Sequence, residues 1–351
     1  PGVDENNGNL MMRMDQGQVS MIARRGDAAP GVSGTFWNLS NQLRINPSGQ
    51  VAFNASVISG TNQNYGVWVA PTTQPELRAT SFQSAPGTNR SFFNFGPPVT
   101  NDSGAVAFWA TLGSSGIEDN GIWSNASGNL SLVARTGQQA AGTGFGVQFN
   151  DFSFGERMML DGMGQTYFEA TLRGAGVSTA NDRGFWRESQ GSLSLLAREG
   201  DLAPGLGATV NFSGLSGLVV NSGGQFAFIG TVTGSGIDNT NNRGLWASDV
   251  DGNLHLLVRR GELFNISGDL NNPEWRTISN VFMNSFFSGG EDGIRNNFNN
   301  QGQLAFRLNF TDGTHGIFVA NTWSAVPEPA SFLVLTAMAT GVALRRRPRQ
   351  T

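Results

Sequence analysis

Five arginines are the residues in this sequence whose type and spacing could do chemistry, because they recur at similar places in successive segments. A guanidinium group donates paired hydrogen bonds to carboxylates and other oxyanions. Arranged in a ring, the five side chains could bind an acidic sugar. Hydrogen bonds that recur between neighbouring repeats explain the same positions more simply, and we favour that interpretation. The five are Arg24, Arg78, Arg135, Arg198 and Arg259.

Carboxylates could do a second kind of chemistry, the paired acid and base work of a glycosidase. Their spacing singles out no pair. The candidates are Glu118, Asp119, Glu156, Asp161 and Glu169. The function that they would support is that of a secreted carbohydrate-active enzyme, either a glycosidase or a lyase.

Loops rich in Asn and Asp could offer oxygen ligands to Ca²⁺. They include residues 118–120, 181–182 and 238–239. The sequence has no complete EF-hand or nonapeptide pattern, so we interpret these loops as ordinary turns and predict no cofactor. His255 and His315 are far apart and in no metal-ligand spacing. We expect His255 to face solvent from an alternating strand.

Several classes of function are excluded by composition and motifs. The chain has no Cys, which rules out disulfides, thiolate metal sites and cysteine nucleophiles. It also lacks His-Glu-x-x-His, Gly-x-Ser-x-Gly and phosphate-binding glycine loops. All basic residues are Arg, and before Glu328 there are 18 of them against 25 acidic residues, a net charge of −7. Nucleic-acid binding needs clustered positive charge, so we expect no nucleic-acid partner.

A recurring octapeptide indicates how these residues are positioned. Asn-x-x-Gly-x-x-Ala-Phe begins at Asn46, Asn101, Asn221 and Asn299, and a variant copy begins at Asp161. The shared glycines are 55, 60, 60 and 78 residues apart. Self-similarity of this kind indicates a repeat architecture. The defining residues are Gly49, Phe53, Gly104, Phe108, Gly164, Phe168, Gly224, Phe228, Gly302 and Phe306.

Each repeat is predicted to form four short strands. They are a Phe-rich segment, Gln-x-Ala-Phe-x-Ala, Gly-x-Trp, and Leu-Ser-Leu-x-Ala-Arg, which has the period of two of a half-buried strand. The last signature is faint at residues 77–87. Asn-x-x-Gly is the turn between the first two strands, with Gly at positive φ and Asn closing an Asx-type turn. Four strands in one such repeat match the size of a propeller blade.

The predicted fold is therefore all-β, with residues 1–325 forming four-stranded repeats, most simply a five-bladed β-propeller. Five and six blades are equal alternatives if residues precede Pro1, and a β-solenoid is the other alternative. Residues 1–34 contain third and fourth strands that could complete the last blade and hide the sheet edges. The longest interval holds roughly 18 extra residues within 264–298, including Trp275, Phe282 and Glu291-Asp292. Function is often located at such departures from a repeat, although an ordinary loop is the alternative.

The composition changes at residue 326. Val326, Pro327, Glu328 and Pro329 precede an apolar run over residues 330–344, and then come Arg345, Arg346, Arg347 and Arg349. The run of 15 residues is short for a spanning helix, which needs about 20 residues. The arginines are expected on the cytoplasmic side. We predict that residues 326–351 form a separate segment with a short apolar helix.

Val-Pro-Glu-Pro, a short apolar run and an Arg-rich end, in this order, resemble the PEP-CTERM sorting signal of Gram-negative bacteria. The resemblance implies export, recognition by an exosortase through Pro327, Glu328 and Pro329, transient anchoring in the inner membrane through 330–344, and removal of the tail. It also implies a cell-surface or extracellular destination linked to exopolysaccharide and the biofilm matrix. The repeats of residues 1–325 resemble the choice-of-anchor tandem-repeat proteins, a resemblance that implies no activity.

These features predict an exported, non-catalytic repeat protein of the cell surface or extracellular matrix, whose partners are exopolysaccharide or surface proteins. The alternative remains the secreted carbohydrate-active enzyme. Two carboxylates about 5–10 Å apart in a central pocket would favour the enzyme.

Overall fold

The computed structural model describes residues 7–40, 42–71, 73–113, 119–152, 158–283 and 296–322. Every regular element in these ranges is a β-strand, so the all-β prediction is confirmed. None of the described segments is a helix with the length and apolarity that a bilayer crossing requires. The predicted sorting motif, apolar helix and basic flank lie outside the described residues.

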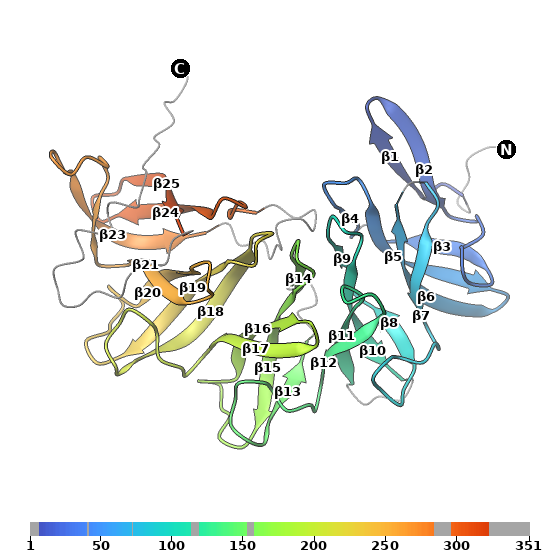
Figure 1. The fold of residues 1–351 in the computed structure, drawn as a ribbon, viewed down its shortest axis with the longest axis horizontal. Helices are drawn as coiled ribbons and strands as arrows, with labels where there is room; N and C mark the ends of the chain where they lie inside the picture. Colours follow the sequence, from blue (N-terminus) through green and yellow to red (C-terminus); the bar gives the residue numbers. More distant parts are fainter. Residues whose placement is uncertain are drawn as a thin grey trace. The chain divides into compact units, whose positions relative to one another are not determined.

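Five antiparallel sheets follow one another along the chain (Figure 1). Sheet one contains β3 (Thr35–Leu39), β4 (Arg44–Ile45), β5 (Val51–Ser59), β6 (Asn62–Ala70) and β7 (Glu76–Thr80). Sheet two contains β8 (Phe92–Phe95), β9 (Val99–Thr100), β10 (Val106–Leu112), β11 (Asn120–Ser124) and β12 (Ser131–Arg135). Sheet three contains β13 (Val147–Asp151), β14 (Met158–Leu160), β15 (Thr166–Gly174), β16 (Arg183–Ser189) and β17 (Ser192–Arg198).

Sheet four contains β18 (Val210–Val220), β19 (Phe226–Gly234), β20 (Arg243–Ser248) and β21 (Leu254–Arg259). Sheet five contains β22 (Leu263–Asn265), β23 (Trp275–Phe282), β24 (Gln303–Phe310) and β25 (His315–Asn321). In sheets one to three the first strand is in two pieces that pair with the same neighbour. The predicted four strands per repeat, in sequence order, are thus confirmed in sheets one to four.

Sheet five and the N-terminal strands differ from this pattern. In sheet five, β23, β24 and β25 correspond to the first, second and third strands of a repeat. The place beside β23 is taken by β22, which pairs with it at the edge of the sheet. At the other end of the chain, β1 (Leu10–Asp15) and β2 (Gln18–Arg24) pair with each other as a two-stranded sheet.

The chain forms two compact units. Of the described residues, those up to residue 176 and residues 186–195 belong to the first unit, and residues 177–185, 196–283 and 296–322 belong to the second. The β1–β2 pair and sheets one and two therefore lie in the first unit, and sheets four and five in the second. The boundary passes through β16 and β17 of sheet three.

The Asn-x-x-Gly turns join first and second strands, as predicted. In the first copy the Gly49 N–H donates to the Asn46 carbonyl (2.9 Å), and Asn46 Oδ1 accepts a hydrogen bond from the Gln50 N–H (2.8 Å). Gly49 has a φ of +77°, and its counterparts in the other copies lie between +72° and +82°. Only glycine adopts this region freely, which explains why the motif requires it. The motif's last residue is a buried Phe in every copy.

The turn asparagines also link successive repeats within each unit, which the sequence analysis did not anticipate. Asn46 Nδ2 donates to the Asn101 carbonyl (2.6 Å), and Asn101 Nδ2 donates to the Asp161 carbonyl (2.8 Å). In the second unit, Asn221 Nδ2 donates to the Asn299 carbonyl (3.1 Å). One side chain therefore closes its own turn and holds the next one.

Sheets one to four each contain an aromatic core of one Trp ring with two Phe rings in sheets one and four and three Phe rings in sheets two and three. In sheet one, Phe53 and Trp68 stack with centroids 6.0 Å apart, and Phe36 meets Trp68 edge-on at 5.2 Å. The Trp68 indole N–H donates to the carbonyl of Pro30 (2.9 Å), in the turn before the sheet. Equivalent bonds in sheets two to four join Trp123 to Pro86, Trp186 to Ala141 and Trp246 to Pro204. Buried indoles usually need such a partner.

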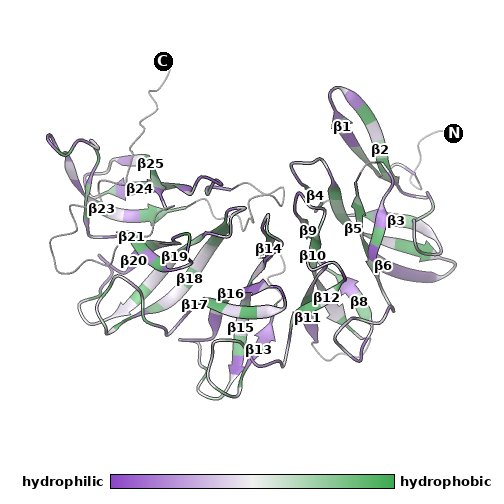
Figure 2. Ribbon diagram, viewed as in Figure 1, coloured by the Kyte–Doolittle hydropathy of each residue, from purple (hydrophilic) through white to green (hydrophobic). Residues whose placement is uncertain are grey.

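Sheet one is buried on both faces. Phe53 and Trp68 pack with the β1–β2 pair on one face, whereas Ala52 and Val67 pack with sheet two on the other. Neighbouring residues of a strand point to opposite faces, so both sets of side chains must be apolar. Figure 2 shows hydrophobic residues along the strands accordingly.

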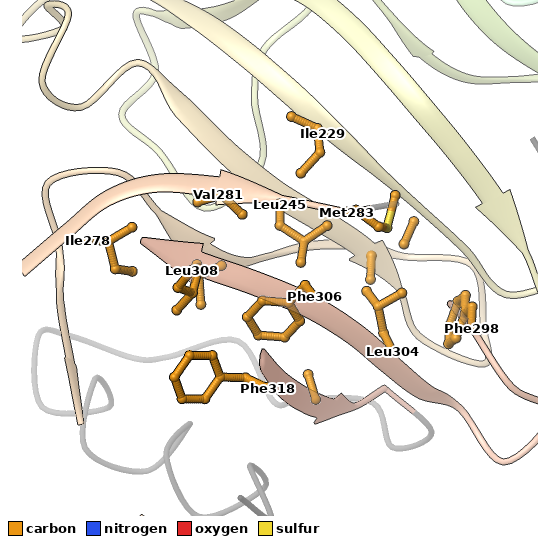
Figure 3. Packing of buried hydrophobic residues seen from close by; sticks show 14 of the residues in the cluster. Ile229, Leu245, Ile278, Val281, Met283, Phe298, Leu304, Phe306, Leu308 and Phe318 are labelled. Atoms are coloured by element: carbon orange, nitrogen blue, oxygen red, sulfur yellow. The ribbon is translucent and has the colours of Figure 1, made fainter. Parts of the chain in front are cut away.

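Sheets four and five pack against each other in the second unit. Figure 3 shows Ile229 and Leu245 of sheet four beside Ile278, Val281 and Leu308 of sheet five. These residues belong to one buried apolar cluster. The cluster lets sheet five join the core although Phe318 stands where the other sheets have Trp.

We expect Asn101→Ala to lower the free energy of unfolding by about 2–4 kcal/mol, because a fully buried amide would leave turn and carbonyl groups without partners. Asn299→Ala is the matched control. Asn299 occupies the same turn position but is exposed, and its amide donates to Gln301 and Gln303 within its own turn. We expect a loss of about 1 kcal/mol there. Urea denaturation measures both, and equal losses would contradict the linking role of Asn101.

Candidate functional site

The strand register locates the predicted arginines. In sheets two and four, Arg135 and Arg259 lie opposite the glycine that begins the Gly-x-Trp strand. In sheet one this position belongs to Thr80. Arg78 lies two residues earlier and forms an ion pair with Glu76 (2.9 Å). Arg78 therefore does not occupy the position that Arg135 and Arg259 share.

The remaining arginines hold segments near them in the chain. Arg24 Nε donates to the carbonyl of Asn7 (3.1 Å), and Arg198 Nε donates to the carbonyl of Asn181 (2.9 Å). Arg259 Nε donates to Glu262 Oε1 (3.1 Å). Each guanidinium thus has a protein partner in its own neighbourhood.

Asp119, one of the nominated carboxylates, is held by two arginines. Arg135 donates two hydrogen bonds to it, one of them from Nε to Oδ1 (2.7 Å), and Arg90 Nε lies 3.2 Å from Oδ2. The hydrogen bond to Asp119 raises the pKa of Arg135. Asp119 is buried. Its ion pair with Arg135 therefore attaches the loop that precedes β11 to the end of β12.

The other nominated carboxylates form no accessible pair in the described part of the chain. Asp161 and Glu169 have exposed fractions of 0% and 3%. Glu118 and Glu156 lie outside the described residues. A substrate therefore could not reach the two that are buried without a change in the fold.

Asp161, another nominated carboxylate, is buried within a network of hydrogen bonds. Its Oδ1 accepts hydrogen bonds from the N–H groups of Met163 (3.0 Å) and Gln165 (2.7 Å), and its Oδ2 accepts one from the Tyr167 hydroxyl (3.1 Å). Burial raises the pKa of Asp161 to about 6, although these hydrogen bonds and the charge of Arg187 oppose the shift. Because the group is buried, its shifted pKa concerns stability.

The Asn- and Asp-rich loops use their side chains to close turns. Asp238 Oδ1 accepts hydrogen bonds from the N–H and the hydroxyl of Thr240, and Asn181 Oδ1 accepts one from the Ser178 N–H. Within the described ranges, no group of three or more acidic or His side chains is placed to hold a metal ion.

His255 is half-buried, contrary to the expectation that it faces solvent. Its Nε2 lies 3.0 Å from Asp249 Oδ2. In the predicted insertion, Trp275 and Phe282 begin and end β23 and are partly exposed. Glu291 and Asp292 lie outside the described residues.

An open pocket of about 670 Å³ lies at one end of sheet one. Its walls come from residues 32 and 33 before β3, from residue 59 with residues 61–64 of the β5–β6 hairpin, and from residues 80–82 at the end of β7 and just after it. All ten lining residues are uncharged. Apart from Val32 and Phe82, they carry hydroxyl or amide side chains. The volume falls within the range of small-ligand sites, and the lining is more polar than the mainly apolar lining that is common there.

Phe82 is the unusual residue of this pocket, because its φ is +66°. In every repeat the equivalent residue donates its N–H to a carbonyl of the next first strand. The equivalents are Gly26, Gly137, Gly200 and Gly261, with φ between +81° and +90°. Gln16 and Gln190 also have positive φ, but they occupy two-residue Gln-Gly hairpin turns that favour it. A left-handed conformation costs a bulky residue roughly 1–2 kcal/mol.

The connection between β5 and β6 leaves room for the Phe82 ring. In sheet three a long loop before the third strand packs over the equivalent glycine, so that a Cβ on Gly200 would lie 2.9 Å from Asn181 Cβ. In sheet one, residues 60 and 61 alone form the turn. The Phe82 side chain is consequently 62% exposed.

Sequence analysis missed this site, although two signals were present. The fourth-strand signature is faint at residues 77–87, and Phe82 stands there where the other copies have Gly. The connection before Gly66 is also shorter than in sheets three and four. Both departures concern residues that are about 20 positions apart in sequence, and only the fold brings them together.

We expect Asp161→Asn to change how stability depends on pH. The folded-state pKa of about 6 exceeds the ordinary value of 3.8, so this group's contribution to stability is greatest below about pH 4 and falls as pH rises to about 6. The loss is at most about 3 kcal/mol. Relative to the wild type, Asp161→Asn should therefore gain stability between pH 4 and 6.

Urea denaturation at a series of pH values measures this difference. Asp102→Asn, at an exposed turn of the preceding repeat, controls for the change in net charge. A difference between Asp161→Asn and wild type that is constant with pH would contradict the raised pKa.

We expect Phe82→Gly to be more stable than Phe82→Ala by about 1 kcal/mol, because only Gly relieves the positive φ. Elsewhere the order is reversed, since Gly in a strand costs roughly 0.5–1 kcal/mol relative to Ala. Phe93, a partly exposed residue of β8, is the control position, where the Ala variant should be the more stable. Thermal denaturation compares the four variants, and the same order at both positions would argue against strain at Phe82.

Similarity to solved structures is weak. The polysaccharide lyase Uly1 matches with 13% identity and a TM-score of 0.33, over 87% of this chain and 83% of that one. A mannose phosphorylase from Leishmania mexicana matches with 10% identity and a TM-score of 0.25, over 84% and 86% of the two chains. An alpha-L-arabinofuranosidase from Podospora anserina matches with 11% identity and a TM-score of 0.25, over 88% and 90%. Scores this low support no conclusion on fold or function.

No curated protein matches the chain. A family profile described as "Family of unknown function (DUF7453)" matches residues 1–69 and 57–333. The two overlapping matches cover nearly all of the sequence, so the chain belongs to DUF7453, a family of unknown function.

Proposed function

We propose that this chain is an exported, non-catalytic repeat protein that binds or scaffolds exopolysaccharide or surface proteins at the cell surface or in the extracellular matrix. The observation that carries the proposal is the pocket of sheet one. Its lining is neutral and polar, with one exposed aromatic ring. Such a lining suits recognition of a polar ligand, and it contains no carboxylate or imidazole that could serve as general acid or base.

The state of the nominated carboxylates supports binding over catalysis. Asp119 is neutralised by two arginines, and Asp161 and Glu169 are buried in their strands and turns. A glycosidase needs two carboxyl groups that face the same substrate. The alternative is a secreted carbohydrate-active enzyme, and analysis of the glycan after incubation would reveal its products.

The proposal of export rests on the sequence of residues 326–351. In it, an exosortase recognises residues 326–329, the run 330–344 anchors the chain transiently in the inner membrane, and the four terminal arginines stay cytoplasmic. Intact-mass analysis of the protein from its native cell tests the processing step. A retained tail would contradict cleavage.

We also propose that the five sheets are the blades of a five-bladed β-propeller. The alternative is a six-bladed propeller that includes these five sheets. The sequential strand order in each sheet and the repeat length support this arrangement.

Screening the full chain on a glycan array, with and without Ca²⁺, tests the binding function. We expect retention on polysaccharide that is independent of Ca²⁺ and releases no product. Chain shortening or unsaturated ends in the bound glycan would contradict the non-catalytic proposal and favour the enzyme. Absence of binding to every glycan on the array would contradict polysaccharide binding and leave surface proteins as the proposed partners.

A further inference from the structure

The pocket of sheet one offers hydrogen-bonding groups that the fold does not use. Six of its polar side chains have no hydrogen bond to any other group in the described part of the chain. They are Ser33, Ser59, Thr61, Asn62, Gln63 and Asn64. Amides and hydroxyls of this kind can both donate and accept, so they can match hydroxyl groups in either role.

The Phe82 ring lines the same pocket, and hydrogen bonds fix the backbone that carries it. The Phe82 N–H donates to the Phe92 carbonyl (2.7 Å), and the Phe92 N–H donates to the Gln83 carbonyl (2.9 Å). The preceding hydroxyl, that of Ser81, donates to the Phe93 carbonyl (2.8 Å) and accepts a hydrogen bond from the Tyr65 N–H (2.9 Å). The backbone that carries the ring is thus tied to two neighbouring strands, and little ordering remains for a ligand to induce.

An exposed ring flanked by unpaired amides and hydroxyls matches the two kinds of surface on a sugar. A pyranose ring has an apolar face of C–H groups, which can pack on an aromatic face. Its hydroxyl rim both donates and accepts hydrogen bonds. The uncharged lining offers an acidic sugar none of the charged partners that recognise carboxylates or sulfates.

We propose that Phe82 is the stacking platform of a site for an uncharged polysaccharide, with amide side chains from residues 62–64 of the pocket as hydrogen-bonding partners for the sugar hydroxyls. This inference rests on the proposed function and narrows its ligand. The strained backbone supports it independently. Phe replaces the Gly that the other four repeats carry and exposes most of its ring to solvent, and such outliers cluster at ligand sites.

Affinity electrophoresis of the full chain tests the site, with dextran, galactomannan or mixed-linkage β-glucan dissolved in the gel and alginate as the acidic comparison. We expect retardation by at least one neutral polysaccharide and none by alginate. Phe82→Gly and Phe82→Ala should raise the dissociation constant by about tenfold or more, which is the size of a lost aromatic contact. Phe82→Tyr should keep the affinity, because it keeps the ring.

Two features of the design separate binding from folding. Phe82→Gly installs the residue that the other repeats have here, so its loss of binding cannot be assigned to a disrupted turn. Phe145→Ala removes a ring that is 99% exposed elsewhere in the first unit and should bind like the wild type.

Three results would overturn the proposal. Equal affinity of Phe82→Gly and wild type for the same neutral polysaccharide would refute the site and leave the proposed function intact. Preferential retardation by alginate would refute an uncharged ligand. A wild type that no polysaccharide retards would refute both this site and polysaccharide binding.

Discussion

The burial of both faces of a sheet constrains where this protein can place any chemistry. In sheet one, Phe53 and Trp68 fill one side and Ala52 and Val67 the other. Since consecutive residues of a strand alternate between the faces, such a strand has no solvent-facing row along its middle. Polar side chains in the middle of such strands are buried as well, and Glu169 in β15 of sheet three is an example. Accessible side chains are therefore concentrated at strand ends and in connections, which is where the pocket of sheet one lies.

The connections are constrained in turn by backbone conformation. Both recurring turns contain a residue with positive φ, one in Asn-x-x-Gly and one after the fourth strand. Glycine meets this requirement without strain, and in sheet three it is also needed because the neighbouring loop packs against it. In sheet one the loop is short, and a side chain has room at that place. The hairpin turn at residues 60 and 61 and Phe82 are thus two parts of one change in the repeat.

Local patterns in the sequence were sufficient to predict the strands, but not the site. Strand order, the Asn-x-x-Gly turn and the buried Phe of Gln-x-Ala-Phe follow from periodicity and turn chemistry within a few residues. The links from one Asn to the next repeat's carbonyl join residues more than 50 positions apart, which no local pattern encodes. Arg78 was aligned by residue type, whereas the register assigns the shared position to Thr80. The predicted propeller ring depends on contacts of still longer range.

The stability that Phe82 contributes to the fold does not account for a Phe at this position. Burying a Phe side chain fully is worth about 1.5–3 kcal/mol, but this one is 62% exposed, and most of that gain is forgone. Its backbone conformation costs roughly 1–2 kcal/mol. Folding alone therefore gains little from the ring, and the hydrogen bonds that hold the turn are made by backbone groups that Gly would supply equally. A ligand that covers the ring would gain the free energy of burial that folding leaves unused. The backbone that carries the ring is already ordered in the folded sheet, so binding would not have to order it.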